Sequence, residues 1–262
     1  MRPTKLRGRL ADVLLMCVFT GCSMFKSGPE KFFEDQQLYA ARAISDGDMK
    51  RLRAVVRPAE IDRPGKKGMT LMWYAIQEKR FDAIEVLVSL GSNPDGQVVQ
   101  GLGTPLSHAL EVEDIRFLTA MLDGGLSVDH LSNGGEPLLS RAAGPHGRTF
   151  DHVQLLVERG ANVNLAASDG ETPIFSAIFT MEPERARYLA DHGADLAVST
   201  VGGVTPGWAI HTIIKRQQPD SAMRRRFEDL RDFIISKGAK WPPDHPDTVM
   251  AWRKTQGLPV AE

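Results

Sequence analysis

The sequence predicts an all-α fold built from stacked helix-turn-helix units of about 33 residues. Three observations predict it: a helix start that recurs along the chain, a glycine that follows each start, and an apolar pair just before each glycine. One such unit is too short to bury its own apolar face. Neighbouring copies must therefore stack on one another to form a core.

The predicted helix starts lie at nearly constant spacing. Threonine is a good N-cap because its side-chain oxygen accepts a hydrogen bond from the first turn, and proline suits the first helical position, where no N–H is needed. The starts are Thr70-Leu71, Thr104-Pro105, Glu136-Pro137, Thr172-Pro173 and Thr205-Pro206. Successive starts are 34, 32, 36 and 33 residues apart.

Each unit is expected to end at a glycine, which readily takes the left-handed conformation that closes a helix. These glycines are Gly91, Gly125, Gly160, Gly193 and Gly238. Start and glycine are 21 residues apart in the first, second and fourth units, 24 in the third and 33 in the fifth. The extra residues, near 144–149 and 214–220, are expected between the paired helices. Insertions in solenoids often mark binding features, and for the fifth unit a lengthened helix pair is the alternative.

At these residues the chain resembles the ankyrin repeat family. The family pattern is roughly G-x-T-P-L-H-x-A, followed by a second helix with L-L-x-x-G-A-[ND]; it is similar to residues 103–109 (GTPLSHA) and 156–162 (LVERGAN). The resemblance covers residues 37–241. It implies an ankyrin-repeat solenoid of about five units with projecting hairpins, after a degenerate N-terminal cap at 37–57. Residues 242–262 are expected to form a C-terminal capping segment, with Trp252 covering the last repeat.

The chain departs from the family at one position of the motif. No unit has the usual histidine, whose place is taken by Trp73, Ser107, Leu139, Phe175 and Trp208. The hydrogen bonds between repeats attributed to that histidine are weakened. We therefore expect a divergent, less regular stack.

The N-terminus, residues 1–21, is typical of a bacterial lipoprotein signal peptide. Four basic residues precede an apolar run at 13–19 that is too short to span a bilayer. Residues 19–23 (FTGCS) resemble a lipobox, whose cysteine becomes lipidated, so we expect a palmitate-type lipid anchor on Cys22 and a tether over 22–36. An ordinary cleaved signal peptide and an uncleaved anchor are the alternatives. Ser23 after the cysteine favours the periplasmic face of the outer membrane in the bacterial envelope.

Composition and charge fit a folded binding protein. Of 262 residues, 42% are hydrophobic and 25% charged, with a formal net charge of -1, so no overall field recruits nucleic acid. Loss of 1–21 would remove four of 32 basic and one of 33 acidic residues, leaving about -4. Both cysteines, Cys17 and Cys22, would be removed or modified, so no internal disulfide is expected. The basic run at 224–226 is followed by acidic residues and is typical of a solvated helix face; contact with acidic lipids or an acidic partner is the alternative.

The sequence shows no pattern typical of catalysis or metal binding. The seven histidines are spread over separate repeats, and none has metal-ligand spacing. Nucleotide-binding and hydrolase motifs are absent from the sequence. We expect no catalytic residue, no cofactor and no metal, and hence no enzyme.

Binding a protein partner of unknown identity is the function that remains. Ankyrin repeat proteins generally bind partners on the concave surface made by hairpin tips and first helices, and the resemblance implies the same surface here. The hairpin-tip candidates are Gln97, Val98, Val99, Gln100, His130, Leu131, Ser132, Ala166, Ala167, Ser168, Val198, Ser199, Thr200 and Val201. The first-helix candidates are Tyr74, Gln77, His108, Glu111, Ser176 and Phe179. Val98, Val99 and Val201 either serve an interface or pack between hairpins.

Three functional hypotheses follow. The first is a lipid-anchored scaffold or adaptor that holds an envelope protein, with support of a periplasmic stress enzyme as a variant. The second is an immunity protein that neutralises a secreted toxin such as a phospholipase effector. The third, an enzyme, lacks any supporting motif.

The lipidation hypothesis predicts the behaviour of Cys22→Ala. Loss of the thiol removes the only atom that the lipobox chemistry can modify. The variant should lose all incorporation of labelled palmitate and move from the membrane fraction to the soluble fraction. Unchanged membrane retention would contradict the hypothesis.

Overall fold

The computed structural model describes residues 28–96, 99 and 101–261. The predicted signal peptide, the lipidation site Cys22 and the hairpin candidates Gln97, Val98 and Gln100 lie outside the described residues. In the part of the chain that is described, no helix is long and apolar enough to cross a membrane.

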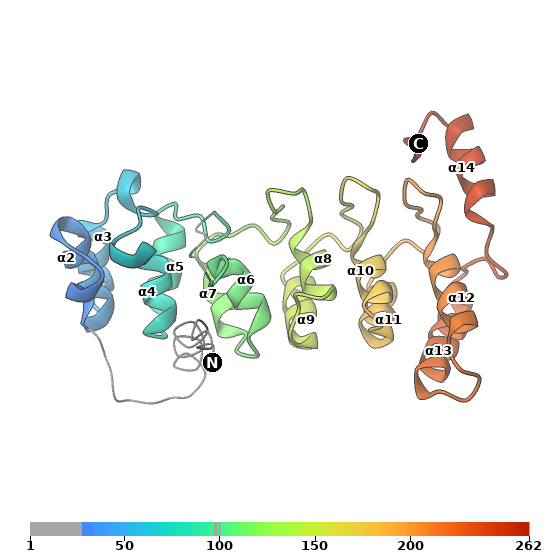
Figure 1. The fold of residues 1–262 in the computed structure, drawn as a ribbon, viewed down its shortest axis with the longest axis horizontal. Helices are drawn as coiled ribbons and strands as arrows, with labels where there is room; N and C mark the ends of the chain where they lie inside the picture. The colour runs from blue at the N-terminus through green and yellow to red at the C-terminus, as the bar shows by residue number, and fades with distance from the viewer. Residues whose placement is uncertain (1–27, 97–98, 100, 262) are drawn as a thin grey trace, which may run out of the picture. The chain divides into compact units, whose positions relative to one another are not determined.

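The described residues form helices joined by loops, and the predicted all-α fold is confirmed (Figure 1). The α-helices are α2 (Asp35–Asp46), α3 (Met49–Val55), α4 (Leu71–Gln77), α5 (Phe81–Ser89), α6 (Pro105–Glu111), α7 (Arg116–Asp123), α8 (Leu138–Ala143), α9 (Phe150–Glu158), α10 (Pro173–Phe179), α11 (Pro183–Asp191), α12 (Pro206–Arg216), α13 (Ala222–Ser236) and α14 (Pro246–Thr255). Short 3-10 turns are η1 (Pro29–Lys31), η2 (Pro58–Glu60) and η3 (Lys66–Gly68).

The chain divides into two compact units. The first unit comprises residues up to 109 together with 116–126 and therefore holds α2 to α5, α7 and most of α6. The second unit comprises 110–115 and residues from 127 onward, and holds α8 to α14. The predicted N-terminal cap at 37–57 is the helix pair α2 and α3 of the first unit.

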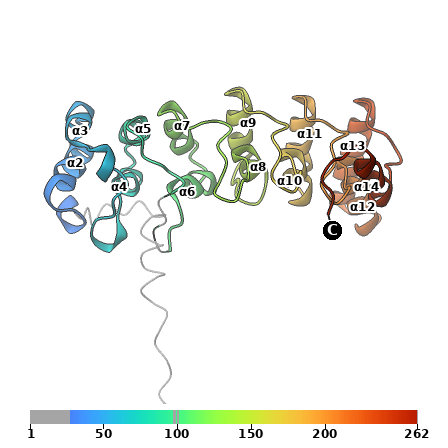
Figure 2. The ribbon, with the colours of Figure 1, turned by 90° about the horizontal axis from the view of Figure 1, so that it is seen from above.

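In the second unit the helices form two layers. The first helices of the pairs, α8, α10 and α12, lie on one side, and the second helices, α9, α11 and α13, lie on the other (Figure 2). The faces between the layers are apolar: Leu156, Ile174 and Leu189 are each fully buried. Helices of six to nine residues gain their stability from this packing, because an isolated helix of that length is marginal in water.

Most of the predicted helix ends are confirmed. Each of the five closing glycines has a positive φ, between 86° at Gly160 and 104° at Gly125. Thr70, Thr104 and Thr205 accept hydrogen bonds from the backbone N–H three residues later, at 3.2, 3.0 and 3.1 Å. These three threonines therefore act as the predicted N-caps.

Two starts differ from the prediction. Helix α8 begins at Leu138 with Pro137 as its N-cap residue, one position later than predicted. Thr172 holds the N-cap position of α10, but its side chain makes no cap bond, and its buried Oγ1 has no hydrogen-bond partner among the described residues. Phe175 stands three residues after Thr172. At the equivalent position of the second repeat, the Ser107 hydroxyl makes a hydrogen bond to the Thr104 hydroxyl at 2.8 Å. Phenylalanine offers no such partner, so the departure from the motif costs a hydrogen bond here.

The extra residues of the third repeat form a buried arginine site. They make the loop 144–149 between α8 and α9, as predicted. Arg185 of α11 is 7% exposed and points its guanidinium at this loop and at the C-terminal end of α8. It donates hydrogen bonds to backbone carbonyl oxygens of residues 142, 143, 144 and 147, at 3.3, 3.4, 3.4 and 3.0 Å. A cation suits this position because the last carbonyls of a helix lack partners and carry partial negative charge.

The extra residues of the fifth repeat lengthen its helices. Helix α12 has 11 residues and α13 has 15, against seven and nine in the preceding pair. In the basic run, Arg224 pairs with Glu228 at 2.8 Å, and Arg226 pairs with Glu184 of α11. Of the two alternatives for this insertion, the structure shows the lengthened helix pair. Part of its basic run is held in ion pairs.

Arg185 generates a test of the fold. Arg185→Met keeps an unbranched side chain but leaves buried carbonyl oxygens without donors, and it should lower the free energy of unfolding by about 2–4 kcal/mol. Arg225→Met, an exposed arginine on α13, should change it by less than about 0.5 kcal/mol. Urea unfolding followed by circular dichroism measures both. Equal stabilities of the two variants would show that Arg185 does not hold the loop.

Candidate protein-binding surface

The hairpins that carry the candidate tip residues share one backbone turn. In each, a tip N–H donates to the carbonyl four residues later, at 2.8–3.0 Å; the pairs are Val99 to Gly103, Ser132 to Glu136, Ala167 to Glu171 and Thr200 to Val204. In the last three hairpins a glycine stands three residues after the donor, at Gly135, Gly170 and Gly203, with φ between 76° and 82°. In the first hairpin the acceptor residue Gly103 has a φ of 73°. The four projecting hairpins that the family resemblance implied are therefore present.

Within each unit, side chains at the hairpin bases connect neighbouring loops. In the second unit, Asp129 accepts from the backbone N–H of Asn162 at 2.8 Å, and Asn164 accepts from that of Asp195 at 2.7 Å. In the first unit Asp62 accepts from the N–H of Asn93 at 3.0 Å. This ladder fixes the spacing of the tips within each unit. In the second unit its sequence signal is an Asp or Asn four residues after a closing glycine, at Asp129 and Asn164.

The hairpin tips at residues 130–132 and 166–168 present candidates to solvent. Leu131 is 48% exposed, and Ala166 and Ser168 are also exposed. His130, Ser132 and Ala167 are half-buried. A leucine this exposed at the end of a projecting hairpin is available to a partner.

Other tip candidates are covered. Val99 is 8% exposed, and Ser199 and Thr200 are each 7% exposed. Val198 and Val201 are half-buried. For Val99, the structure supports packing within the fold rather than a place on an exposed interface.

The first-helix candidates have different surroundings. Tyr74 is 1% exposed; its ring lies edge-on to Phe33 at 5.5 Å, and its hydroxyl bonds Ser45 Oγ at 2.8 Å. It therefore belongs to the core of the first unit. His108 is half-buried between Trp73 and Phe117, whereas Gln77 and Glu111 are exposed and Ser176 is half-buried.

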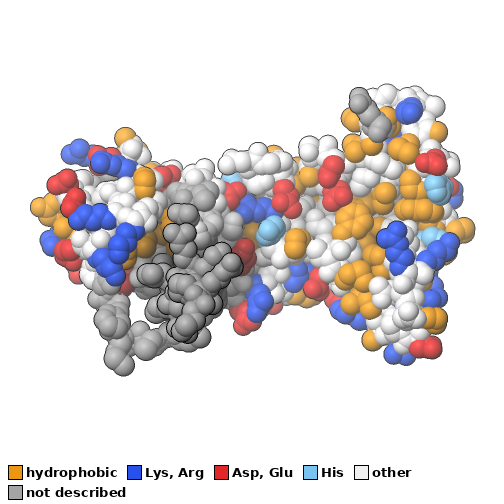
Figure 3. All heavy atoms as spheres, viewed as in Figure 1, with side chains coloured by type: hydrophobic (Ala, Val, Ile, Leu, Met, Phe, Trp, Pro, Cys, Tyr) orange, Lys and Arg blue, Asp and Glu red, His pale blue; other side chains and the backbone are white. Residues whose placement is uncertain are grey.

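Phe179 is the first-helix candidate with a large exposed apolar side chain. It is 47% exposed and packs one face against Phe175 at a centroid distance of 5.8 Å. Hydrophobic side chains gather on the surface between α10 and α12, on the first-helix face of the second unit (Figure 3). Half-buried Trp208 of α12 adds to this face.

Sequence reasoning missed an aromatic cluster beside this patch. Trp208 contacts His211 on the same helix at 5.7 Å and His245 at 4.8 Å, and His211 contacts Trp241 at 5.4 Å. The spacing of Trp208 and His211 by three residues was a local signal. The contact of α12 with residues 241–245 had no such signal in the sequence.

The hairpin bases of the second unit carry negative charge. Partial burial raises the pKa of Glu171, and the nearby carboxylates of Asp169 and Glu136 raise it further. The Glu171 carboxyl therefore keeps its proton to a higher pH than a free glutamate does. A partner with basic side chains would be favoured along this edge.

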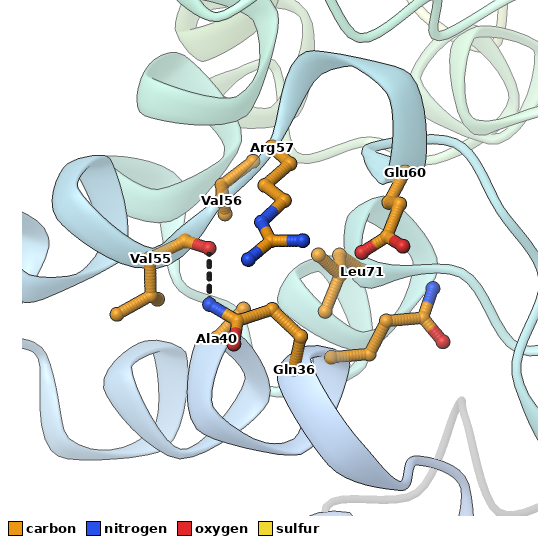
Figure 4. A pocket seen from close by; sticks show the side chains of 8 residues that line it. Gln36, Ala40, Val55, Val56, Arg57, Glu60 and Leu71 are labelled. Atoms are coloured by element: carbon orange, nitrogen blue, oxygen red, sulfur yellow. Dashed lines mark hydrogen bonds between the residues drawn. The ribbon is translucent and has the colours of Figure 1, made fainter.

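A small hollow of the first unit does not fit a small-molecule ligand. It lies in the first unit, beneath Arg57 and between Gln36 and Leu71 (Figure 4), and has about 10 Å³ of free space, no more than one water molecule needs. Gln36 donates a hydrogen bond to the Val55 carbonyl oxygen at 2.8 Å at its edge. A neighbouring depression of about 300 Å³ is larger and is lined largely by charged and amide side chains. In the described part of the chain, no group of three or more His, Cys, Asp or Glu is placed to hold a metal ion.

His108 generates a prediction about pH. Burial lowers its pKa, so the fold favours the neutral ring; that stabilisation is full above the unfolded-state pKa of about 6.5 and is lost as the pH falls through the folded-state pKa. His108→Phe keeps the contacts with Trp73 and Phe117 and should reduce the loss of stability between pH 7.5 and 5. A part will remain, because burial also lowers the pKa of His211. Urea unfolding at both pH values measures this, with exposed His146→Gln as control; an equal loss in the two variants contradicts it.

Comparison with known proteins finds sequence relatives of modest identity. No protein-family model matches the chain. Protein PhlB of Serratia liquefaciens is 29% identical over 182 residues, covering 66% of this chain and 78% of PhlB. The human BCL-6 corepressor-like protein 1 is 37% identical over 106 residues, which are 40% of this chain but only 5% of that protein.

Solved structures give a clearer result. The ankyrin repeat domain of Bcl-3 superimposes with a TM-score of 0.57 and 21% identity, covering 82% of this chain and 95% of that domain. An ankyrin repeat domain from Acinetobacter baumannii AYE gives a TM-score of 0.54 and 20% identity, covering 77% of this chain and 98% of that domain. These similarities agree with the paired helices, the closing glycines and the projecting hairpins. The chain has the ankyrin-repeat fold.

Proposed function

We propose that this chain is a non-catalytic, protein-binding module that acts as a scaffold or adaptor at the periplasmic face of the bacterial envelope. The ankyrin-repeat fold is typical of protein-binding modules. The lipobox-like residues around Cys22 support a lipid anchor, and the basic and apolar residues before it support export.

The observation that carries the binding proposal is the exposed apolar surface of the second unit. Leu131 at a hairpin tip is 48% exposed, and Phe179 at the end of a first helix is 47% exposed. Exposed large apolar side chains are costly in water unless a partner covers them, and aromatic anchors carry much of the energy of protein interfaces. The acidic groups at the hairpin bases add charge selectivity for the partner.

A crosslinked pull-down from the native envelope tests this proposal. The bait is the lipidated chain, and the variant Phe179→Ser should reduce recovery of its main partner about tenfold or more, because it removes a buried aromatic anchor from the complex. Its matched control is Ile235→Ser. Ile235 is 39% exposed but lies on α13, a second helix. Equal recovery with both variants would contradict the proposed surface.

The identity of the prey separates the two binding hypotheses. A resident envelope protein recovered in stoichiometric amount makes the chain a scaffold, or a support factor if that protein is a stress enzyme. A secreted toxin such as a phospholipase makes it an immunity protein. The second result would also predict that the purified chain inhibits the toxin.

A further inference from the structure

The C-terminal segment of the chain lies on the tip of the last hairpin. Helix α14 and the C-terminus stand beside the hairpin that joins α11 to α12 (Figure 1). The approach is closest at Gly203, where an added Cβ would clash with the carbonyl oxygen of Pro246 and lie 2.9 Å from Met250 Cγ. Gly203 thus serves both the hairpin turn and the contact with α14.

Arg253 is the main polar link between α14 and the hairpin. Its Nη1 donates to the Ser199 carbonyl oxygen at 2.9 Å and to Ser199 Oγ at 3.0 Å, and its Nε donates to the Pro259 carbonyl oxygen at 2.9 Å. One guanidinium therefore joins the hairpin tip, α14 and the tail that follows it. Hydrogen bonds to a charged donor are stronger than those between neutral groups.

The tail continues a row of hydrogen bonds that runs from hairpin to hairpin. Val201 donates its N–H to the carbonyl oxygen of Asp169 in the preceding hairpin at 2.8 Å. Ala261 then donates its N–H to the carbonyl oxygen of Val201 at 2.9 Å. The tail thus takes the place that the next hairpin would have in a longer repeat array.

This docking is shallow compared with the packing of the repeats. Helix α14 has no buried residue, and Trp252, which we expected to cover the last repeat, is 56% exposed. Helix α13, by contrast, buries Phe227, Leu230 and Ile234. A segment with few buried apolar contacts opens at a smaller free energy than the global unfolding of its neighbours.

The segment before α14 is held more firmly. His245, the N-cap residue of α14, lies edge-on to Trp208 of α12, and Trp241 contacts His211 of the same helix. Pro243 lies within 3.4 Å of the Cβ position of Gly207 in that helix. These contacts form a pivot at 241–245, beyond which the chain is held mainly by Arg253 and Ala261.

We propose that residues 246–261 are a removable strap, whose docking site is the tip of the last hairpin. The strap binds Ser199 through Arg253 and so occupies, within the same chain, a tip of the kind proposed above to bind a partner. A partner that uses the last hairpin must displace it. The inference that the strap blocks a partner rests on the proposed function. The inference that the strap opens does not rest on it.

Hydrogen–deuterium exchange of the full chain, without any partner, tests the opening. The amides of α14 and of Ala261 should exchange at least about tenfold faster than the Val201 amide and the amides of α12, because the strap opens while the repeats stay folded. Arg253→Ala should speed exchange of α14 and Ala261 by a further factor of about ten, since it removes three hydrogen bonds. The melting temperature of the repeats should stay within a few degrees of the wild type.

Lys254→Ala is the matched control, because Lys254 is the exposed neighbour of Arg253 on the same helix. It should leave exchange unchanged. Equal exchange of the α14 and α12 amides in the wild type would overturn the proposal, since the segment would then open only with the whole unit. A large loss of melting temperature in Arg253→Ala would also overturn it and make the segment part of the core. A failed pull-down would affect only the proposed function.

Discussion

The short length of most helix pairs is the constraint on which the rest of the structure depends. A first helix of seven residues and a second of nine, as in α10 and α11, cannot bury enough apolar surface alone, so each pair must stack on its neighbours. Stacking then turns the loops between pairs into a row of projecting hairpins. Arg185 shows how an added loop is accommodated, with its donors placed on carbonyls that the extra residues would leave unpaired.

Function follows from what stacking leaves outside. Within the second unit, the buried positions repeat from pair to pair, while the tips and the outer positions of the first helices differ. Leu131 and Phe179 are exposed on this face, and the carboxylates near Glu171 give it a negative edge. The strap over the last tip means that the tips are not equally accessible. A partner meets an open surface at the tips 130–132 and 166–168 and a covered one at the last hairpin.

The repeat pattern was predictable from sequence because its signals are local. A threonine cap, a closing glycine such as Gly193 and the residues between them act within one unit, and the paired helices follow. Burial of Tyr74 was not predictable, because it depends on Phe33 and Ser45, which are far away in the sequence. The buried position of Arg185 could not be predicted for the same reason, because its hydrogen-bond partners lie about 40 residues earlier in the sequence. The surface patch and the strap likewise depend on contacts between repeats.

The central claim is that the hairpin tips and first helices of the second unit bind the partner. The most direct measurement is a hydrogen–deuterium exchange footprint of the full chain with the partner that it captures, compared with the free chain. The account predicts protection at the tips 130–132 and 166–168 and at the end of α10, residues 176–179, with α9 and α11 unchanged. Protection confined to α9 and α11, with the tips exchanging as in the free chain, would contradict it.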